Sequence, residues 1–224
     1  MTNYKIILAS ASPRRKEIME QMGIPYQVMV ADVEETVSET EPSRMVQALA
    51  SLKTEAVLSK YIMHDGCNGN NKDNKDNKGN KADNINAGQE KFIIIGADTM
   101  VFFDGHALGK PKDEADAFRM LRMLSGKSHE VISGVSIIIN DSRQQRLSFA
   151  VSTKVMMQNL TDEQIKDYIA TGEPVDKAGA YAIQGKFGLY IREIRGDYYN
   201  VVGFPISRIY EVLLDLGIDL KKQN

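Results

Sequence analysis

Two serines and two arginines stand close together near the start of the chain, in the sequence Ser-Ala-Ser-Pro-Arg-Arg at residues 10–15. Residues 4–9 before it have the composition of a short buried strand, and the apolar residues after it recur at helical spacing as far as Gly23. Ser12 is predicted to be the N-cap and Pro13 the first helical residue. The helix dipole disfavours cations in a first turn, so a bound phosphate would compensate for them. A capped helix with solvated arginines explains the spacing equally well.

Asp98 is the second candidate for chemistry, because it follows the apolar run 92–96, which predicts a buried strand. Ligands of α/β proteins bind at strand ends, where a carboxylate can act as a general base or hold a metal. The alternative is a turn aspartate that hydrogen-bonds its own backbone. Glu35 belongs to an acidic cluster that is either a solvated loop or, together with Asp98, a site for Mg²⁺ or Mn²⁺, which take oxygen ligands.

Two further positions carry polar groups that a nucleotide could use. Lys110 lies in a tight Gly-Lys-Pro connection, from which it could reach a phosphate, although a plain surface lysine is more usual. Gln184 lies in the glycine-containing segment 173–186, where small residues let the backbone approach a ligand. Its amide could match the polar edge of a pyrimidine base. Tyr181 and Phe187 could wall a flat ring, although core packing is the commoner use of both.

Composition excludes several classes of protein. With 28 basic and 30 acidic residues among 224, the net charge is -2, so no overall field attracts a nucleic acid polymer, and any anion site must be local. A single cysteine, Cys67, rules out an internal disulfide and agrees with a cytoplasmic location. No apolar run approaches the roughly 20 residues that would cross a bilayer, and no secretory signal pattern is present. We expect one domain that binds a small anionic ligand.

Strand and helix patterns alternate along the chain, which predicts an α/β fold with a mixed twisted sheet flanked by helices. A helix over 44–61 places Lys53 on the edge of its apolar face. Residues 65–90 consist mostly of asparagine, lysine, aspartate and glycine, which predicts a low-complexity, disordered surface insert. The remaining predicted elements are strands over 26–30, 92–95, 100–103, 131–139, 147–157, 189–194 and 201–202, and helices after Asp113, after Thr161 and over 205–216.

Five motifs in order resemble the Maf family of nucleoside triphosphate pyrophosphatases over nearly the whole chain apart from the insert, where family members usually have a shorter connection. They are Ser-Ala-Ser-Pro-Arg-Arg at 10–15, Gly-Ala-Asp-Thr at 96–99, Gly-Lys-Pro at 109–111, Leu-Ser-Gly-Lys-Ser-His at 124–129 and Gly-Glu-Pro-Val-Asp-Lys-Ala-Gly-Ala-Tyr-Ala-Ile-Gln-Gly at 172–185. The Ala-Ile-Gln-Gly sequence around Gln184 is similar to the branch that acts on dTTP and UTP, and unlike the branch that acts on 7-methylated GTP.

The resemblance implies a single Maf-like domain over 1–224, with two lobes around a nucleotide-binding cleft, that hydrolyses the bond between the α and β phosphates with a divalent metal cation. Asp98 would be the catalytic proton acceptor and, with Glu35, a metal ligand. The phosphates would be bound by Ser12, Arg14, Arg15, Lys53 and Lys110. Substrate choice would depend on Arg14, Thr99 and Gln184.

The resemblance leaves several alternatives open. The same chemistry could act on 7-methyl-GTP or another modified nucleotide, and the family is also linked to septum formation, which would suit a nucleotide-binding regulator without turnover. Either Mg²⁺ or Mn²⁺ could be the metal. The family further suggests a homodimer in the cytoplasm that helps to clear unwanted nucleotides.

Overall fold

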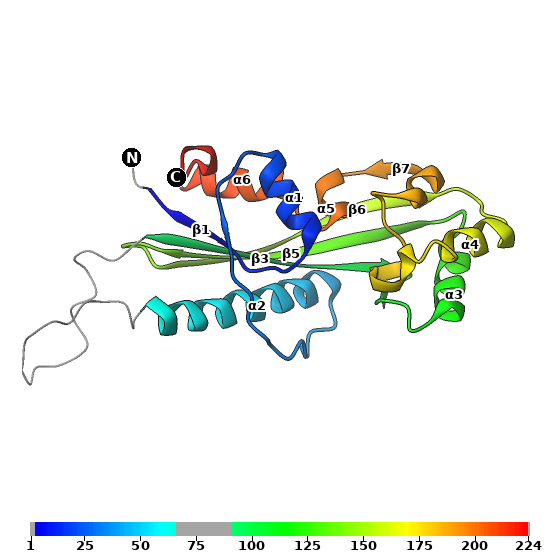
Figure 1. Cartoon of the computed structure of the whole chain (residues 1–224), viewed down its shortest axis with the longest axis horizontal. Helices are drawn as coiled ribbons and strands as arrows, with labels where there is room; N and C mark the ends of the chain where they lie inside the picture. Colours follow the sequence, from blue (N-terminus) through cyan, green and yellow to red (C-terminus); the bar gives the residue numbers. More distant parts are fainter. Residues whose placement is uncertain (1–2, 66–90, 224) are drawn as a thin grey trace, which may run out of the picture.

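The computed structural model describes residues 3–65 and 91–223, which form a long mixed sheet with helices on both of its faces (Figure 1). Nearly all of the predicted insert, residues 66–90, lies outside the described residues. The elements are β1 (Lys5–Leu8), α1 (Pro13–Gln21), β2 (Gln27–Val28), α2 (Pro42–Asp65), β3 (Phe92–Phe103), β4 (His106–Leu108), α3 (Glu114–Leu124), β5 (Ser128–Asn140), β6 (Gln145–Met157), α4 (Asp162–Ile169), β7 (Ile191–Arg195), α5 (Tyr198–Val202) and α6 (Ile206–Asp215), with the short 3₁₀ helices η1 (Glu173–Asp176), η2 (Ala178–Ala180), η3 (Lys186–Tyr190) and η4 (Leu220–Lys222).

The sheet has seven strands in the order β2-β1-β3-β5-β6-β7, with β4 paired to β3. β1 runs parallel to β2 and β3, and every other pairing is antiparallel. The predicted α/β class with a mixed sheet is therefore confirmed. The two apolar runs of β3 form one continuous strand, which turns at 104–105 into β4.

Of the four hydrophobic clusters among the described residues, the two largest lie along this sheet and make up its two lobes. The first packs α1 and α6 against β1, β3 and β5, around Ile18, Ile95 and Leu213. The second packs α3 and α4 around Leu121 and Ile165. Because β3 and β5 contribute side chains to both cores, the lobes share a common sheet.

One predicted strand is wrong. Residues 201–202 belong to the helix α5, although two adjacent valines favour a strand by local propensity. The carboxylate of Asp197 accepts a hydrogen bond from the backbone N–H of Tyr199, which caps the start of the helix. Gly203, with a φ of 113°, ends it. The buried side chain of Asn200 then fixes the helix to the sheet, because its Nδ2 donates to the carbonyl of Val131 at 2.9 Å and to Thr153 Oγ1 at 3.0 Å.

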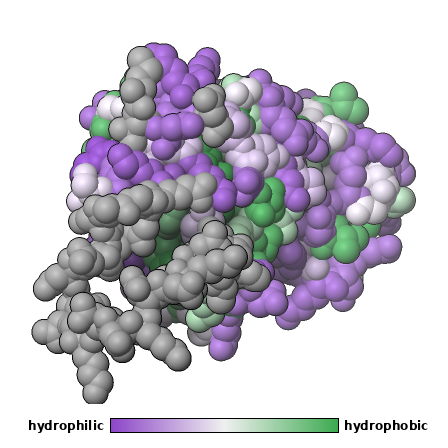
Figure 2. All heavy atoms as spheres, turned by 60° about the vertical axis from the view of Figure 1, so that its left-hand side comes forward, coloured by the Kyte–Doolittle hydropathy of each residue, from purple (hydrophilic) through white to green (hydrophobic). Residues whose placement is uncertain are grey.

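The described surface is predominantly polar. In the view of Figure 2, hydrophilic side chains cover most of the visible described atoms, with smaller hydrophobic areas between them. Within residues 3–65 and 91–223, no helix is long and apolar enough to cross a membrane.

Two glycines let α2 pack very close to the sheet, on the face opposite α1 and α6 (Figure 1). A Cβ on Gly134 would lie 2.2 Å from the backbone carbonyl of Val46, and a Cβ on Gly96 would lie 2.6 Å from Thr54 Cγ2. A hydrogen bond of 2.7 Å between Thr54 Oγ1 and Ser136 Oγ joins the same surfaces. This contact sets the distance of α2 from β3 and β5.

Substituting alanine for Gly134 is expected to lower the free energy of unfolding by about 1 to 3 kcal/mol or more, because the new methyl group meets helix backbone and cannot be accommodated by a side-chain rotation. Gly109→Ala is the matched control, since nothing lies within 4 Å of its added Cβ. Urea denaturation of the two variants measures the difference. Equal stabilities would contradict the close contact.

Candidate active site

A cavity of about 330 Å³ lies between the two cores, beside the start of α1. Its walls come from elements far apart in the sequence: the N-terminus of α1, the middle of α2 and β3, the 109–111 connection, the 176–183 segment and the end of α5. The predicted site residues that line it are Ser12, Arg14, Arg15, Lys53, Asp98, Thr99 and Lys110. The structure thus brings most of the residues named from sequence to one place.

Asp98 is buried in the middle of β3, opposite Gly134 of β5, so the expectation that it ends its strand is wrong. The physical reason is that β3 continues beyond its neighbour β1. The last register pair between these two strands is Leu8 with Ile95, after which the chain leaves the sheet toward α1. Asp98 therefore lies just past the carboxyl end of β1, in the space that opens there.

Lys53 joins two carboxylates. Its Nζ donates a hydrogen bond of 2.5 Å to Asp98 Oδ1 and lies 3.2 Å from Glu35 Oε1. Asp98 Oδ2 has no hydrogen bond within the described part of the chain. One cation thus already bridges Glu35 and Asp98, and one carboxylate oxygen is left without a partner.

These two carboxylates are a partial donor set for a metal. Their oxygens suit Mg²⁺ or Mn²⁺, and both reach a common cation at Lys53 Nζ. Among residues 3–65 and 91–223, no group of three or more His, Cys, Asp or Glu side chains could hold a metal ion. A cation held by these two carboxylates would need its remaining ligands from outside the described residues.

The guanidinium of Arg15 donates four hydrogen bonds within the protein. Its Nη1 donates to Ala97 O at 2.7 Å and to Ser10 Oγ at 3.0 Å. Its Nε donates to Gly203 O at 2.8 Å and its Nη2 to Thr99 Oγ1 at 3.3 Å. Burial lowers the pKa of Arg15, while the negative charge of Asp98 opposes that shift. Of the five guanidinium N–H groups, one is left for a ligand.

Arg14, the next residue toward the N-terminus, behaves differently. Within the described residues, neither Arg14 nor Lys110 makes a hydrogen bond or an ion pair through its side chain, and both line the cavity. The backbone around Lys110 is nevertheless fixed, because Gly109 O accepts from the N–H of Gly179 at 3.0 Å. These two cations are free to bind an anion. Ser12 precedes α1 as predicted, but its hydroxyl does not cap the helix.

Of the other two residues predicted to determine specificity, Thr99 lines the cavity and Gln184 does not. The Thr99 hydroxyl lines the cavity and contacts Ser133 Oγ at 2.8 Å and Gly203 O at 3.2 Å. Gln184 is half-buried and follows the lining residue Ile183, but is not itself part of the cavity wall. Its role in substrate choice stays a prediction.

Tyr181 forms part of the wall and is held from behind. Its hydroxyl lies 2.7 Å from Nε2 of His129, a buried residue of β5 whose pKa burial lowers to about 4. His129 is therefore neutral near pH 7 and supports the wall. Ala182, the residue after Tyr181, is held as well, because its backbone N–H donates a hydrogen bond of 3.3 Å to the hydroxyl of Tyr168. Phe187 is fully buried in the second core, as packing favours.

Sequence reasoning missed three contributors to the wall. Asp176 and Lys177 line the cavity as a mutual ion pair, and Gly203 lines it where its carbonyl accepts from Arg15 Nε. Nothing in the spacing of the first two distinguishes them from surface charges. The role of Gly203 follows from α5, whose Asp at the start and Gly at the end were the available signal.

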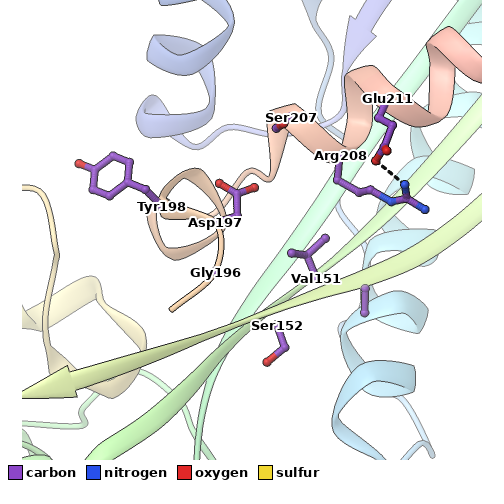
Figure 3. A pocket seen from close by; sticks show the side chains of 9 residues that line it. Val151, Ser152, Gly196, Asp197, Tyr198, Ser207, Arg208 and Glu211 are labelled. Atoms are coloured by element: carbon purple, nitrogen blue, oxygen red, sulfur yellow. Dashed lines mark hydrogen bonds and ion pairs between the residues drawn. The ribbon is translucent and has the colours of Figure 1, made fainter. Parts of the chain in front are cut away.

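A wider hollow of about 710 Å³ lies elsewhere, between β6 and the α5–α6 region (Figure 3). Its lining includes Asp197, Tyr198 and the ion pair of Arg208 with Glu211, but none of the site residues predicted from sequence. Glu211 neutralises Arg208 and Asp197 leaves this lining negative, which does not suit an anionic ligand, so the smaller cavity is the candidate active site.

Similar sequences are found among known proteins. The family model described as Maf-like protein matches residues 5–216. This chain belongs to the Maf family. The dTTP/UTP pyrophosphatase of Lachnoclostridium phytofermentans is 44% identical over 223 residues, covering 98% of this chain and 99% of that protein. That of Agathobacter rectalis is 44% identical over 218 residues, covering 96% and 99%. The solved structure of the Staphylococcus aureus Ham1 protein aligns with 96% of this chain and 100% of its own at 15% identity and a TM-score of 0.44, a weak likeness.

Substitutions of Arg14 and Arg15 in this Maf protein are expected to change the free energy of unfolding by different amounts. Arg15→Lys should lower the free energy of unfolding by about 1 to 3 kcal/mol, because a lysine cannot satisfy the carbonyl and hydroxyl acceptors that the guanidinium holds. Arg14→Lys should change it by less than about 0.5 kcal/mol, since Arg14 has no partner to lose among the described residues. Urea denaturation without nucleotide measures both. Equal effects would contradict the structural role assigned to Arg15.

Proposed function

We propose that this chain is a nucleoside triphosphate pyrophosphatase that hydrolyses dTTP and UTP to the monophosphate and pyrophosphate, as a single Maf-like domain over residues 1–224. The observation that carries the proposal is the buried Asp98, bridged through Lys53 to Glu35, in a cavity that also exposes the unpaired cations Arg14 and Lys110. The names of relatives at 44% identity support the same substrates.

In this proposal the cations bind the triphosphate. Arg14 and Lys110 reach it directly, since neither side chain makes a hydrogen bond or an ion pair within the described residues. Lys53 and the remaining N–H of Arg15 complete the set, with Ser12 as a hydroxyl donor. Groups that neutralise the charge growing on the departing pyrophosphate lower the barrier, provided that they are already in place before the reaction begins.

Asp98 is the proposed proton acceptor. Lys53 holds Oδ1, so the carboxylate has a fixed orientation, and Oδ2 is available to take a proton from the attacking water. Asp98 belongs to the middle of a long hydrogen-bonded strand. This strand fixes the position of the carboxylate relative to the phosphate-binding groups on α1 and α2.

Glu35 and Asp98 are also the residues that would hold a divalent cation, Mg²⁺ or Mn²⁺. When bound, such a cation would lower the pKa of a water molecule and neutralise phosphate oxygens. We assign the choice of base to Arg14, Thr99 and Gln184, beside the flat wall of Tyr181. The proposal includes a cytoplasmic homodimer with no membrane or nucleic acid polymer as partner.

Asp98→Asn is expected to lower kcat at least about 100-fold, because the amide cannot accept the proton from water. Asp215→Asn, a charge change of the same size at an exposed position on α6, should leave kcat unchanged. Pyrophosphate release measures both variants. Near-normal turnover by the Asp98 variant would exclude it as the proton acceptor.

The substrate is tested with a panel of dTTP, UTP, CTP, dCTP, GTP, ATP and 7-methyl-GTP, each with Mg²⁺ and with Mn²⁺. Turnover concentrated on dTTP and UTP, with the monophosphate as the second product, is the expected result. A preference for 7-methyl-GTP would keep the reaction and change the substrate. Absence of turnover on the whole panel would leave the regulatory role in septum formation as the better explanation.

A further inference from the structure

Two adjacent residues of opposite charge line the active-site cavity but have no part in the proposed reaction. Asp176 ends η1 and Lys177 follows it, and Lys177 Nζ forms an ion pair with Asp176 Oδ1. The lysine side chain is only 18% exposed, whereas the aspartate side chain is 68% exposed. Lys177 is therefore the member of the pair that is enclosed by the protein.

The backbone that carries Lys177 is fixed on both sides. Its N–H donates to Pro174 O at 3.1 Å, and its carbonyl accepts from Ala180 N–H at 3.0 Å. Gly179 is tied in turn to the connection that carries Lys110, and a Cβ on this glycine would lie 3.1 Å from Val101. The segment is thus held against the cavity by its main chain, so it does not depend on the ion pair for its position.

The cations around the cavity differ in how firmly the protein holds them. Lys53 is shared by two carboxylates, one of them buried, and Arg15 is bound by two backbone carbonyls and two hydroxyls. Lys177 is held by one mostly exposed carboxylate. An ion pair with one exposed member is weakened, because water competes for the carboxylate of Asp176. A triphosphate, which carries more negative charge and more acceptor oxygens than a carboxylate, would compete successfully for this lysine.

Asp176 is ionised and lies near a second cation. The hydrogen bond from Lys177 holds the pKa of Asp176 below its ordinary value, and the charges of Lys177 and Arg14 lower it further. Asp176, Lys177 and Arg14 all line the same cavity.

We propose that Lys177 is a further phosphate-binding residue, and that Asp176 keeps it directed into the cavity until its ammonium group passes from the carboxylate to a phosphate oxygen of the substrate. This inference rests on the proposed function and adds one residue to the phosphate-binding set. The exchange breaks one ion pair and forms another, with no covalent change.

The test is the dissociation constant of α,β-imido-dTTP, which cannot be cleaved between the α and β phosphates, measured by calorimetry on the full chain. Lys177→Met should weaken binding about 10-fold, the loss expected for one charge-assisted hydrogen bond. Lys177→Arg should restore most of the affinity. Asp176→Asn should tighten binding by about 2- to 5-fold, because it removes the competing carboxylate.

Opposite effects of Lys177→Met and Asp176→Asn on the dissociation constant separate this role from a merely structural ion pair. If the ion pair were only structural, removing either residue would change the dissociation constant in the same direction. The double variant separates this role from direct repulsion between the Asp176 carboxylate and the phosphates. If Asp176 acts through Lys177, then Asp176→Asn should no longer tighten binding in the Lys177→Met background. Lys186→Met, an exposed lysine of the same segment outside the cavity wall, is the control and should bind like the parent protein.

Unchanged binding by Lys177→Met, or an equal gain from Asp176→Asn with and without Lys177, would overturn the inference while leaving the proposed function intact. Parent protein that binds the analogue but releases no pyrophosphate from dTTP or UTP would overturn the enzymatic proposal and leave the role of Lys177 testable by binding. Parent protein that does not bind the analogue would overturn both.

Discussion

The guanidinium of Arg15 is the interaction on which the site depends most. It joins the N-terminal stretch before α1, the middle of β3 and the end of α5 through four hydrogen bonds, two of them to backbone carbonyls. A half-buried cation with this many partners is costly to leave unsatisfied, so the three elements must meet at one geometry. That geometry brings Ser12, Arg14 and Thr99 together in the lining of the cavity.

A second constraint comes from the opposite face of the sheet, where Gly96 and Gly134 let α2 lie against the strands. Lys53 extends from this helix to Asp98, so the separation of helix and strand decides whether the ammonium group and the carboxylate can meet. Backbone proximity of α2 thus brings Lys53 to Asp98, while the hydrogen bonds of Arg15 to Ala97 and Thr99 fix α1 against the same stretch of β3. Their combination in one cavity is a property of the tertiary fold.

Two helix starts are predicted correctly from local signals, whereas features that depend on distant contacts are not. The capping box of Thr161 and Gln164 and the cap at Asp113 need only neighbouring residues, and both are present. Asp98 was misplaced because the length of β3 depends on pairing with β5, more than thirty residues away along the chain. α5 was missed because Asn200 and its partners on two strands override the strand propensity of the valines. Most of the site was predictable from its motifs, whereas Asp176 and Lys177 became visible only through the cavity.

The continuity of β3 has a mechanical consequence. This strand passes from one core to the other with unbroken pairing to β5, and Asp98 lies on the stretch that links them. The two lobes therefore cannot rotate about a flexible linker in the way that hinged two-domain enzymes close on their substrates, because such a rotation would break the central ladder. The reactive carboxylate and its lysine are preorganised by the fold itself, which limits the ordering that a nucleotide must impose when it binds.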